Sequence, residues 1–89
     1  MTSIKKRISY SRSFKKEYQK LPQEIQENLN QKLKFLSEDP QHPSLRLKKM
    51  GGTVYWEISI TMNYRLILRF DGEEIKLITV GTHDILKKV

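Results

Sequence analysis

The residues of this chain that could carry chemistry are mainly arginines and lysines, together with two histidines, and there is no cysteine. RNA can be cleaved without a metal ion if its own 2′-hydroxyl attacks the adjacent phosphorus in line. An enzyme that promotes this reaction needs a proton acceptor, a cation for the charge that develops in the transition state, and a proton donor for the leaving 5′-oxygen. The basic residues and histidines of the C-terminal half are candidates for these roles.

Arg65 and His83 are the first candidates. A guanidinium grips two phosphate oxygens and stays charged at any cellular pH, so Arg65 suits the stabilisation of charge. A histidine exchanges protons near neutral pH, so His83 suits the transfer of a proton. Lys48 could share the role of the base, because neighbouring cations favour the neutral form of a lysine, and Glu57 is the other candidate base. Further residues that could bind the RNA backbone are Arg46, Lys49 and Arg69.

The same residues also fit ordinary structural roles. Arg65 and Arg69 alternate along an expected strand, as on a solvated sheet face, and Glu57 could form a cross-strand ion pair with either of them. A single histidine after a strand, such as His83, is usually a turn residue, and His42 lies in an expected loop next to a proline. Spacing alone therefore favours the structural interpretation. The nuclease interpretation requires Arg65 and His83 to lie close enough for one phosphodiester to contact both.

Metal and nucleotide chemistry find little support in the sequence. Two histidines without cysteine and without clustered carboxylates do not form a recognisable metal site. The glycines Gly51, Gly52 and Gly72 fall in expected hairpins rather than between a strand and a helix, where a phosphate-binding loop would lie. We therefore expect no metal and no small-molecule cofactor.

Hydrophobic spacing predicts a strand and two helices in the first half of the chain. Alternation over residues 5–10 predicts a short half-buried strand with Ile8 and Tyr10 on one side. Ser11 or Ser13 can cap the first helix. Its apolar stripe is Phe14, Tyr18 and Leu21, and the stripe of the second helix is Ile25, Leu29, Leu33 and Leu36. The two helices join at Leu21-Pro22, with proline in a first helical turn, and the second ends at Asp39-Pro40.

After a loop over residues 41–44, the hydrophobic period changes to two, which predicts strands over residues 45–50, 54–60, 64–70 and 74–80. Gly51-Gly52, Met62-Asn63 and Asp71-Gly72 supply the turns, and residues 83–89 form a tail or a helical turn. The residues expected to pack beneath the helices are Trp56, Ile58, Leu66, Leu68 and Leu77, whereas Arg65 and Glu57 face away. The predicted fold is one α+β domain over residues 1–89, with an N-terminal strand and two antiparallel helices packed on a mainly antiparallel, twisted sheet of four to five strands.

The net charge of +7 favours a polyanionic partner such as nucleic acid or an acidic protein segment, although lysines also keep a small domain soluble. Positive charge is concentrated in residues 1–20, where seven lysines and arginines face one glutamate. No stretch is long and apolar enough for a membrane span, and polar residues follow the basic N-terminus where a signal peptide would be apolar. Together with the lack of cysteine, this predicts a cytoplasmic location.

Four stretches resemble the RelE/ParE toxin superfamily across nearly the whole chain. They are residues 14–22 (FKKEYQKLP), residues 45–52 (LRLKKMGG), residues 55–58 (YWEI) through 63–67 (NYRLI), and residues 80–84 (VGTHD). The NYRLI and VGTHD pieces are the more specific ones. This resemblance implies the toxin of a type II toxin–antitoxin system, a ribosome-dependent endonuclease that cleaves messenger RNA in the ribosomal A site and is held silent by a cognate antitoxin.

The resemblance also implies roles for individual residues. The family arginine that stabilises the phosphate falls on Arg65, and the basic or histidine residue after the last strand falls on His83. The basic residues before the first central hairpin fall on Arg46, Lys48 and Lys49. Residues 84–89 depart from the family pattern, because they lack the tyrosine that many members carry near the C-terminus.

Two other functions are compatible with this resemblance. A ParE-like inhibitor of DNA gyrase shares the fold but needs no residues for phosphate cleavage. A catalytically weak relative would only bind RNA or an acidic partner through its basic face. The presence of both Arg65 and His83 favours the nuclease.

Overall fold

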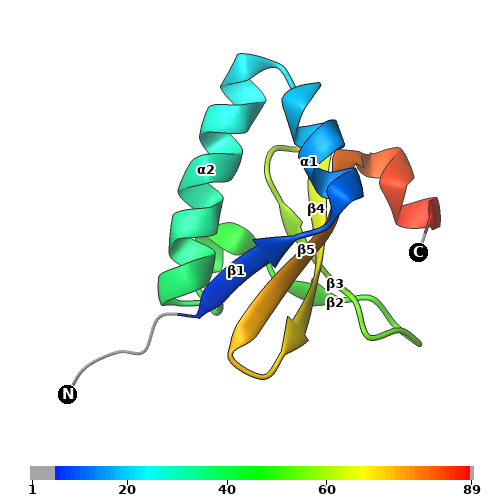
Figure 1. Cartoon of the computed structure of the whole chain (residues 1–89). Coiled ribbons are helices and arrows are strands. Elements are labelled where there is room, and N and C mark those ends of the chain that lie inside the picture. The colour runs from blue at the N-terminus through cyan, green and yellow to red at the C-terminus, as the bar shows by residue number, and fades with distance from the viewer. Residues whose placement is uncertain (1–5, 89) are drawn as a thin grey trace.

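The computed structural model describes residues 6–88, without the side chains of residues 87 and 88 (Figure 1). Its elements, in chain order, are β1 (Arg7–Tyr10), α1 (Arg12–Gln19), α2 (Gln23–Glu38), the 3₁₀ helix η1 (Pro43–Leu45), β2 (Lys48–Lys49), β3 (Trp56–Ser59), β4 (Tyr64–Asp71), β5 (Glu74–Thr82) and the 3₁₀ helix η2 (His83–Lys88). The predicted α+β class is confirmed. Lys5, the first residue of the predicted N-terminal strand, and Val89, the last of the predicted tail, lie outside the described residues.

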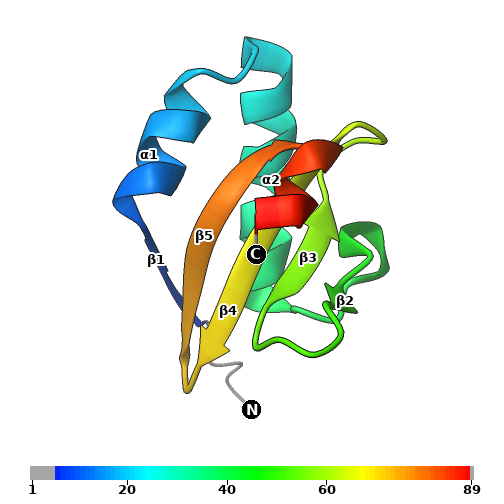
Figure 2. The ribbon, with the colours of Figure 1, turned by 90° about the vertical axis from the view of Figure 1, so that its right-hand side faces the viewer.

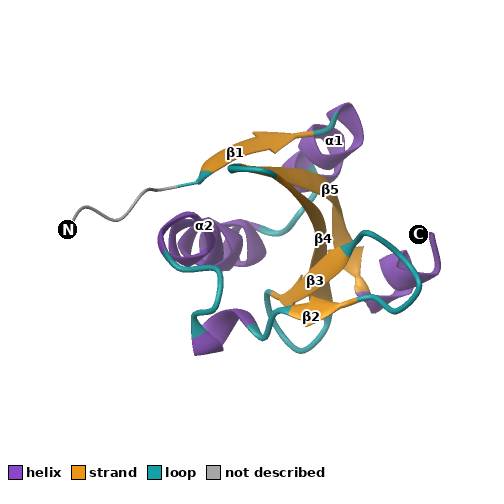
Figure 3. Cartoon of the chain, turned by 90° about the horizontal axis from the view of Figure 1, so that it is seen from below, coloured by secondary structure: helices purple, strands orange, loops and turns teal. Residues whose placement is uncertain are grey.

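The five strands form one sheet in the order β1-β5-β4-β3-β2. β1 runs parallel to β5, and all other neighbours are antiparallel, so the predicted mainly antiparallel sheet is confirmed. α2 lies on one side of this sheet and η2 on the other, as the view from below shows (Figure 3). Figure 2 shows η2 lying over the upper part of β4 and β5. Both faces of the sheet are thus partly covered.

A serine caps the start of α1, whereas α2 begins after Pro22 without a side-chain cap. The Ser11 hydroxyl accepts a hydrogen bond from the Phe14 amide at 3.0 Å. The same hydroxyl donates to the Ile78 carbonyl at 2.7 Å, which ties the start of α1 to β5. Pro22 precedes α2 as its N-cap rather than lying within the first turn, and Asp39 ends the helix. None of the described helices combines the length and apolar character that crossing a membrane requires.

The core lies between α1, α2 and the sheet, as predicted. Leu29 and Leu36 of α2 are fully buried against the inward side chains of β3, β4 and β5, which are Ile58, Leu66, Leu68, Ile75, Leu77 and Val80. Trp56 is partly buried and meets Phe70 edge-on, with ring centroids 5.7 Å apart. Because Leu66 points into this core, the alternation of a strand turns its neighbour Arg65 toward the other face.

The strand predicted over residues 45–50 is wrong for most of its length, since only Lys48 and Lys49 pair with β3. Pro43 starts a 3₁₀ turn instead, and the His42 ring caps it by accepting a hydrogen bond from the Ser44 amide at 3.2 Å. Leu45 is completely buried at the end of this turn. Two leucines spaced by two residues suit a strand, but here the first belongs to the turn.

Two further predictions about the strands need correction. β3 begins at Trp56 rather than Val54, which is 60% exposed in the preceding loop. Tyr10, predicted to share a half-buried side with Ile8, is 58% exposed, although its ring contacts that of Phe14. β1 is an edge strand, so nothing in the sheet covers the outer side of its last residue.

Candidate functional site

Arg65 is positioned by the sheet and by the turn between β3 and β4. In the ladder it lies between Ser59 of β3 and Gly81 of β5. Its Nη1 group donates to the carbonyls of Thr61 at 2.7 Å, Met62 at 2.9 Å and Tyr64 at 3.1 Å. These contacts hold the half-buried guanidinium against the turn. The Nη2 and Nε groups make no hydrogen bond within the described part of the chain, so they can donate to an anion.

Arg65 lines a recess of about 300 Å³ that we call the basic recess. Its lining residues are Lys32, Ser44, Arg46, Ser59, Ile60, Thr61, Met62 and Arg65. The recess brings together two of the predicted residues, Arg46 and Arg65. Lys32 was not predicted from the sequence, since it reaches the recess only because α2 packs beside η1. The only sequence signal is its position on α2 next to Leu33 of the apolar stripe.

His83 lies beside the same turn. It is exposed, begins η2, and lines a separate recess with Asn63, Tyr64, Thr82 and Asp84. Its amide donates to the Asn63 carbonyl at 3.1 Å. The two recesses share no lining residue, and each includes residues of the turn over residues 61–64. The structure brings Arg65 and His83 to one turn of the chain, and each side chain lines its own recess.

Lys48 and Glu57, the other two candidates for catalysis, are direct partners in the β2–β3 ladder. Glu57 lies two residues before Ser59, which is the residue opposite Arg65. The Arg65 guanidinium contacts the turn carbonyls rather than Glu57, so the alternative of an Arg65–Glu57 ion pair is not what the structure shows. Glu57 thus lies on β3, next to the strand that carries Arg65, whereas Lys48 lies one strand further away, on β2. Neither residue lines the basic recess.

Lys49 and Arg69 lie apart from both recesses. The Lys49 ammonium lies 6.0 Å from the centroid of the Trp56 ring. This separation is at the limit of a cation–π contact. Arg69 is paired in register with Lys76 of β5, whose ammonium lies 3.4 Å from an Asp71 carboxylate oxygen. Within residues 6–88, no three carboxylate or histidine side chains gather as a metal-binding group.

The segment that carries His83 is fixed by close packing of η2 on β5. Ile85 is 5% exposed, and a Cβ atom added at Gly81 would lie 2.8 Å from its Cγ2 atom. Glycine at position 81 therefore lets η2 approach the strand, and Gly81 is also the residue paired with Arg65.

We expect Gly81→Ala to lower the stability to unfolding by about 1 to 3 kcal/mol, because the added methyl must displace a buried side chain. Thermal unfolding followed by circular dichroism measures this change. Gly51→Ala is the matched control, since no atom lies within 4 Å of its added Cβ and its backbone is not left-handed. Equal melting temperatures for the two variants would contradict the close packing of η2.

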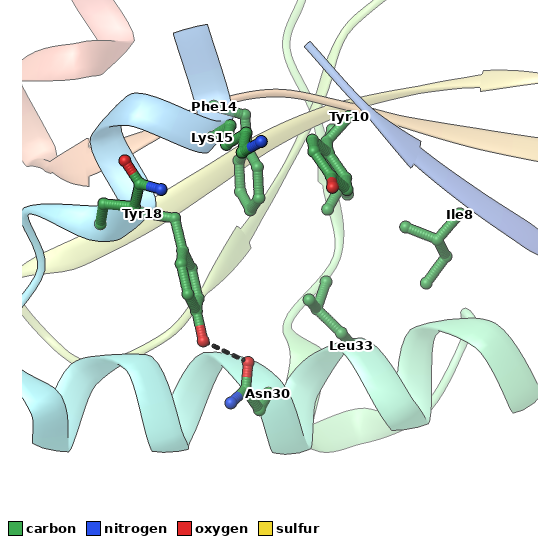
Figure 4. A pocket seen from close by; sticks show the side chains of 9 residues that line it. Ile8, Tyr10, Phe14, Lys15, Tyr18, Asn30 and Leu33 are labelled. Atoms are coloured by element: carbon green, nitrogen blue, oxygen red, sulfur yellow. Dashed lines mark hydrogen bonds between the residues drawn. The ribbon is translucent and has the colours of Figure 1, made fainter. Parts of the chain in front are cut away.

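An apolar groove lies on the helical side of the molecule, between β1, α1 and α2 (Figure 4). It has a volume of about 490 Å³ and is lined by Ile8, Tyr10, Phe14, Lys15, Tyr18, Gln19, Asn30, Leu33 and Leu77. At one end the Tyr18 hydroxyl donates to the Asn30 Oδ1 atom at 2.8 Å, which links α1 to α2. Apolar side chains otherwise line most of the groove, and it opens beside an edge strand.

Comparisons with known proteins agree with this architecture. The family model described as "ParE toxin of type II toxin-antitoxin system, parDE" matches residues 8–86. The comparison with curated proteins found no match.

Several solved toxin structures share the fold. A chain of the Escherichia coli DinJ-YafQ toxin-antitoxin complex aligns with a TM-score of 0.77 at 17% identity, covering 93% of this chain and 98% of that one. The YoeB/ParE toxin from Agrobacterium tumefaciens aligns with a TM-score of 0.75 at 19% identity, covering 86% of this chain and 98% of that one. A chain of the intact E. coli RelBE toxin-antitoxin complex aligns with a TM-score of 0.72 at 23% identity, covering 86% of this chain and 95% of that one. These TM-scores show that the chain shares its fold with the three toxins.

Proposed function

Since this chain belongs to the family of ParE toxins of type II toxin–antitoxin systems, we propose that it is a toxin that cleaves messenger RNA without a metal ion. The observation that carries the proposal is the Arg65 guanidinium, fixed by three turn carbonyls with two nitrogens left for a phosphate. It lies in a recess shared with Lys32 and Arg46 and lined by no carboxylate. Such a site favours the binding of phosphate oxygens.

In this proposal the RNA strand crosses the turn over residues 61–64 and so reaches both recesses. Arg65 holds the non-bridging oxygens of the scissile phosphate as their charge grows. The 2′-hydroxyl gives up its proton as the new O–P bond forms, and the bond to the 5′-oxygen breaks as that oxygen takes up a proton. His83 transfers one of these protons, and Lys48 or Glu57 takes part in the other transfer. The products are a 2′,3′-cyclic phosphate and a 5′-hydroxyl.

The setting of this reaction is part of the proposal. The substrate is messenger RNA in the ribosomal A site, and the toxin acts in the cytoplasm. The positive net charge supports a polyanionic target of this kind, because it favours association with RNA and with ribosomal surfaces. Lys49 and Arg69 would contact backbone phosphates outside the two recesses.

A cognate antitoxin would hold the toxin silent. Two of the similar structures are toxin–antitoxin complexes, which supports a protein partner of this type. The apolar groove between β1, α1 and α2 is a suitable seat for an amphipathic antitoxin segment, because it offers aromatic and aliphatic contacts. Lys15 at its border suits an acidic residue of that segment.

We expect Tyr10→Ala to weaken antitoxin binding at least about tenfold, because tyrosines in apolar grooves are frequent binding hot spots. Isothermal titration calorimetry with the purified antitoxin measures the change. Val54→Ala is the control, since Val54 is 60% exposed, close to the 58% of Tyr10, and does not line the groove. Equal affinities of both variants and the unmodified chain would place the antitoxin elsewhere.

Inhibition of DNA gyrase is the second candidate function. It is favoured by the ParE description of the matching family model and by the separation of Arg65 and His83 into two recesses. Induction of the chain in a bacterium separates the two functions. Cleaved messenger with unchanged DNA supercoiling supports the nuclease, whereas intact messenger with trapped gyrase–DNA complexes supports the inhibitor.

A further inference from the structure

The basic recess gathers three cations from distant parts of the chain. Lys32 comes from α2, Arg46 follows η1, and Arg65 lies on β4. Ser44, Ser59 and Thr61 add hydroxyl groups, and none of the lining residues is acidic. Three positive charges held together without a neutralising carboxylate repel one another, and a bound anion would relieve that repulsion.

Lys32 and Arg46 keep hydrogen-bond donors free within this recess. The Lys32 ammonium donates to the Ser44 carbonyl at 2.8 Å, which anchors it beside η1. An ammonium has three donors, so two of its N–H groups stay available. The exposed Arg46 side chain makes no hydrogen bond to the described residues. Together with the free nitrogens of Arg65, these donors exceed what a single phosphate needs.

Arg46 also stands in an unfavourable backbone conformation. With φ 51° and ψ 47° it is left-handed, and it is the one non-glycine residue with positive φ in the described chain. Glycine or asparagine adopts this conformation more easily than arginine does. Strained positions of this kind cluster at functional sites, where the side chain is needed despite the strain. The strained residue Arg46 lines the basic recess, so its guanidinium adds positive charge there.

We propose that Lys32 and Arg46 form a subsite for a second backbone phosphate, next to the scissile phosphate held by Arg65. This assignment rests on the proposed function in placing the scissile phosphate at Arg65. The subsite reads no base, so it holds single-stranded RNA in register by its backbone alone.

The experiment measures the affinity of the chain for a single-stranded RNA whose riboses are all 2′-O-methylated, so that it cannot be cleaved. We expect Lys32→Gln and Arg46→Gly each to weaken binding about fivefold at physiological salt. Each variant should also reduce the slope of log affinity against log salt by about 0.7, the value for one phosphate contact on a single strand. Lys34→Gln is the matched control, because Lys34 is an exposed lysine of the same helix outside the recess.

Arg46→Gly tests the strain at the same time. Glycine tolerates the left-handed conformation, so the thermal unfolding midpoint of this variant should equal or exceed that of the unmodified chain while its RNA affinity falls. Loss of affinity therefore cannot come from unfolding. Affinities and salt slopes of the two recess variants that match those of Lys34→Gln would overturn the proposal. It would also be overturned if the recess variants lost affinity only for the acidic segment of an antitoxin.

The outcome is separable from that of the proposed function. If the chain cleaves no RNA but the recess variants still bind the methylated strand more weakly in the expected way, the nuclease proposal fails and the phosphate subsite stands. If the chain cleaves RNA but the recess variants bind as the control does, the nuclease stands and the subsite fails.

Discussion

Arg65→Ala is expected to lower RNA cleavage at least about a hundredfold, because the loss of one preorganised donor to a developing anionic charge typically costs this much. The remaining cations of the basic recess cannot replace it, since none is fixed by the β3–β4 turn as Arg65 is. Growth arrest after induction at equal expression, together with a cleavage assay on messenger fragments, measures the effect.

Arg69→Ala is the matched control for this variant. Arg69 lies on the same strand and on the same side of it, but outside the recess, so its loss should reduce cleavage less than about tenfold through weaker binding alone. Both variants should still unfold cooperatively, because neither side chain belongs to the buried core, but Arg65→Ala should unfold at a somewhat lower temperature because it loses three hydrogen bonds to the turn. Full toxicity of a folded Arg65→Ala variant would remove the central residue of the proposed site.

His83→Gln is expected to lower the cleavage rate by about 10² to 10⁴, the usual contribution of a positioned proton carrier. Glutamine keeps much of the size and polarity of the side chain but cannot exchange a proton in the neutral range. The rate of the unmodified chain should change with pH across that range, and the residual rate of the variant should not. Single-turnover cleavage at a series of pH values measures both.

The second histidine provides the control for this experiment. His42 stacks on Phe35 with ring centroids 4.2 Å apart and caps η1, so it has a structural role. His42→Gln should keep the pH dependence of the unmodified chain even if its stability falls. A His83→Gln variant with an unchanged rate and pH profile would exclude His83 as a proton carrier and leave Lys48 and Glu57 as the candidates.

The sequence predicts most of the fold because hydrophobic periodicity reports which side of each element is buried. The stripe of Leu29 and Leu36 and the alternation of Ile58, Leu66 and Leu68 depend only on local spacing, and the structure confirms them. The region around Leu45 is different. Leu45 and Leu47 fit a strand equally well, and only the packing of η1 against α2 shows that the chain turns there.

The candidate site is less predictable, because it depends on contacts between distant residues. The sequence identifies Arg65 and Arg46 by type, but their meeting in one recess follows from the packing of α2, η1 and the β3–β4 turn. Lys32 could not be recognised in advance, since a lysine next to an apolar helix stripe is usually solvated. The three carbonyls that hold Arg65 depend on the conformation of residues 61–64, which no local pattern specifies.

The central claim is that the chain cleaves RNA by attack of the 2′-hydroxyl, with protein side chains and no metal ion. The most direct test is the chemistry of the RNA ends that the purified chain produces from messenger on ribosomes programmed with a defined codon in the A site. Free magnesium is needed to keep ribosomes intact, so the metal cannot be removed from the assay. The chemical nature of the RNA ends therefore distinguishes the two outcomes. We expect 5′-hydroxyl ends opposite 2′,3′-cyclic phosphates, in amounts that fall with Arg65→Ala. Ends with 5′-phosphates, or messenger that stays intact, would contradict the account.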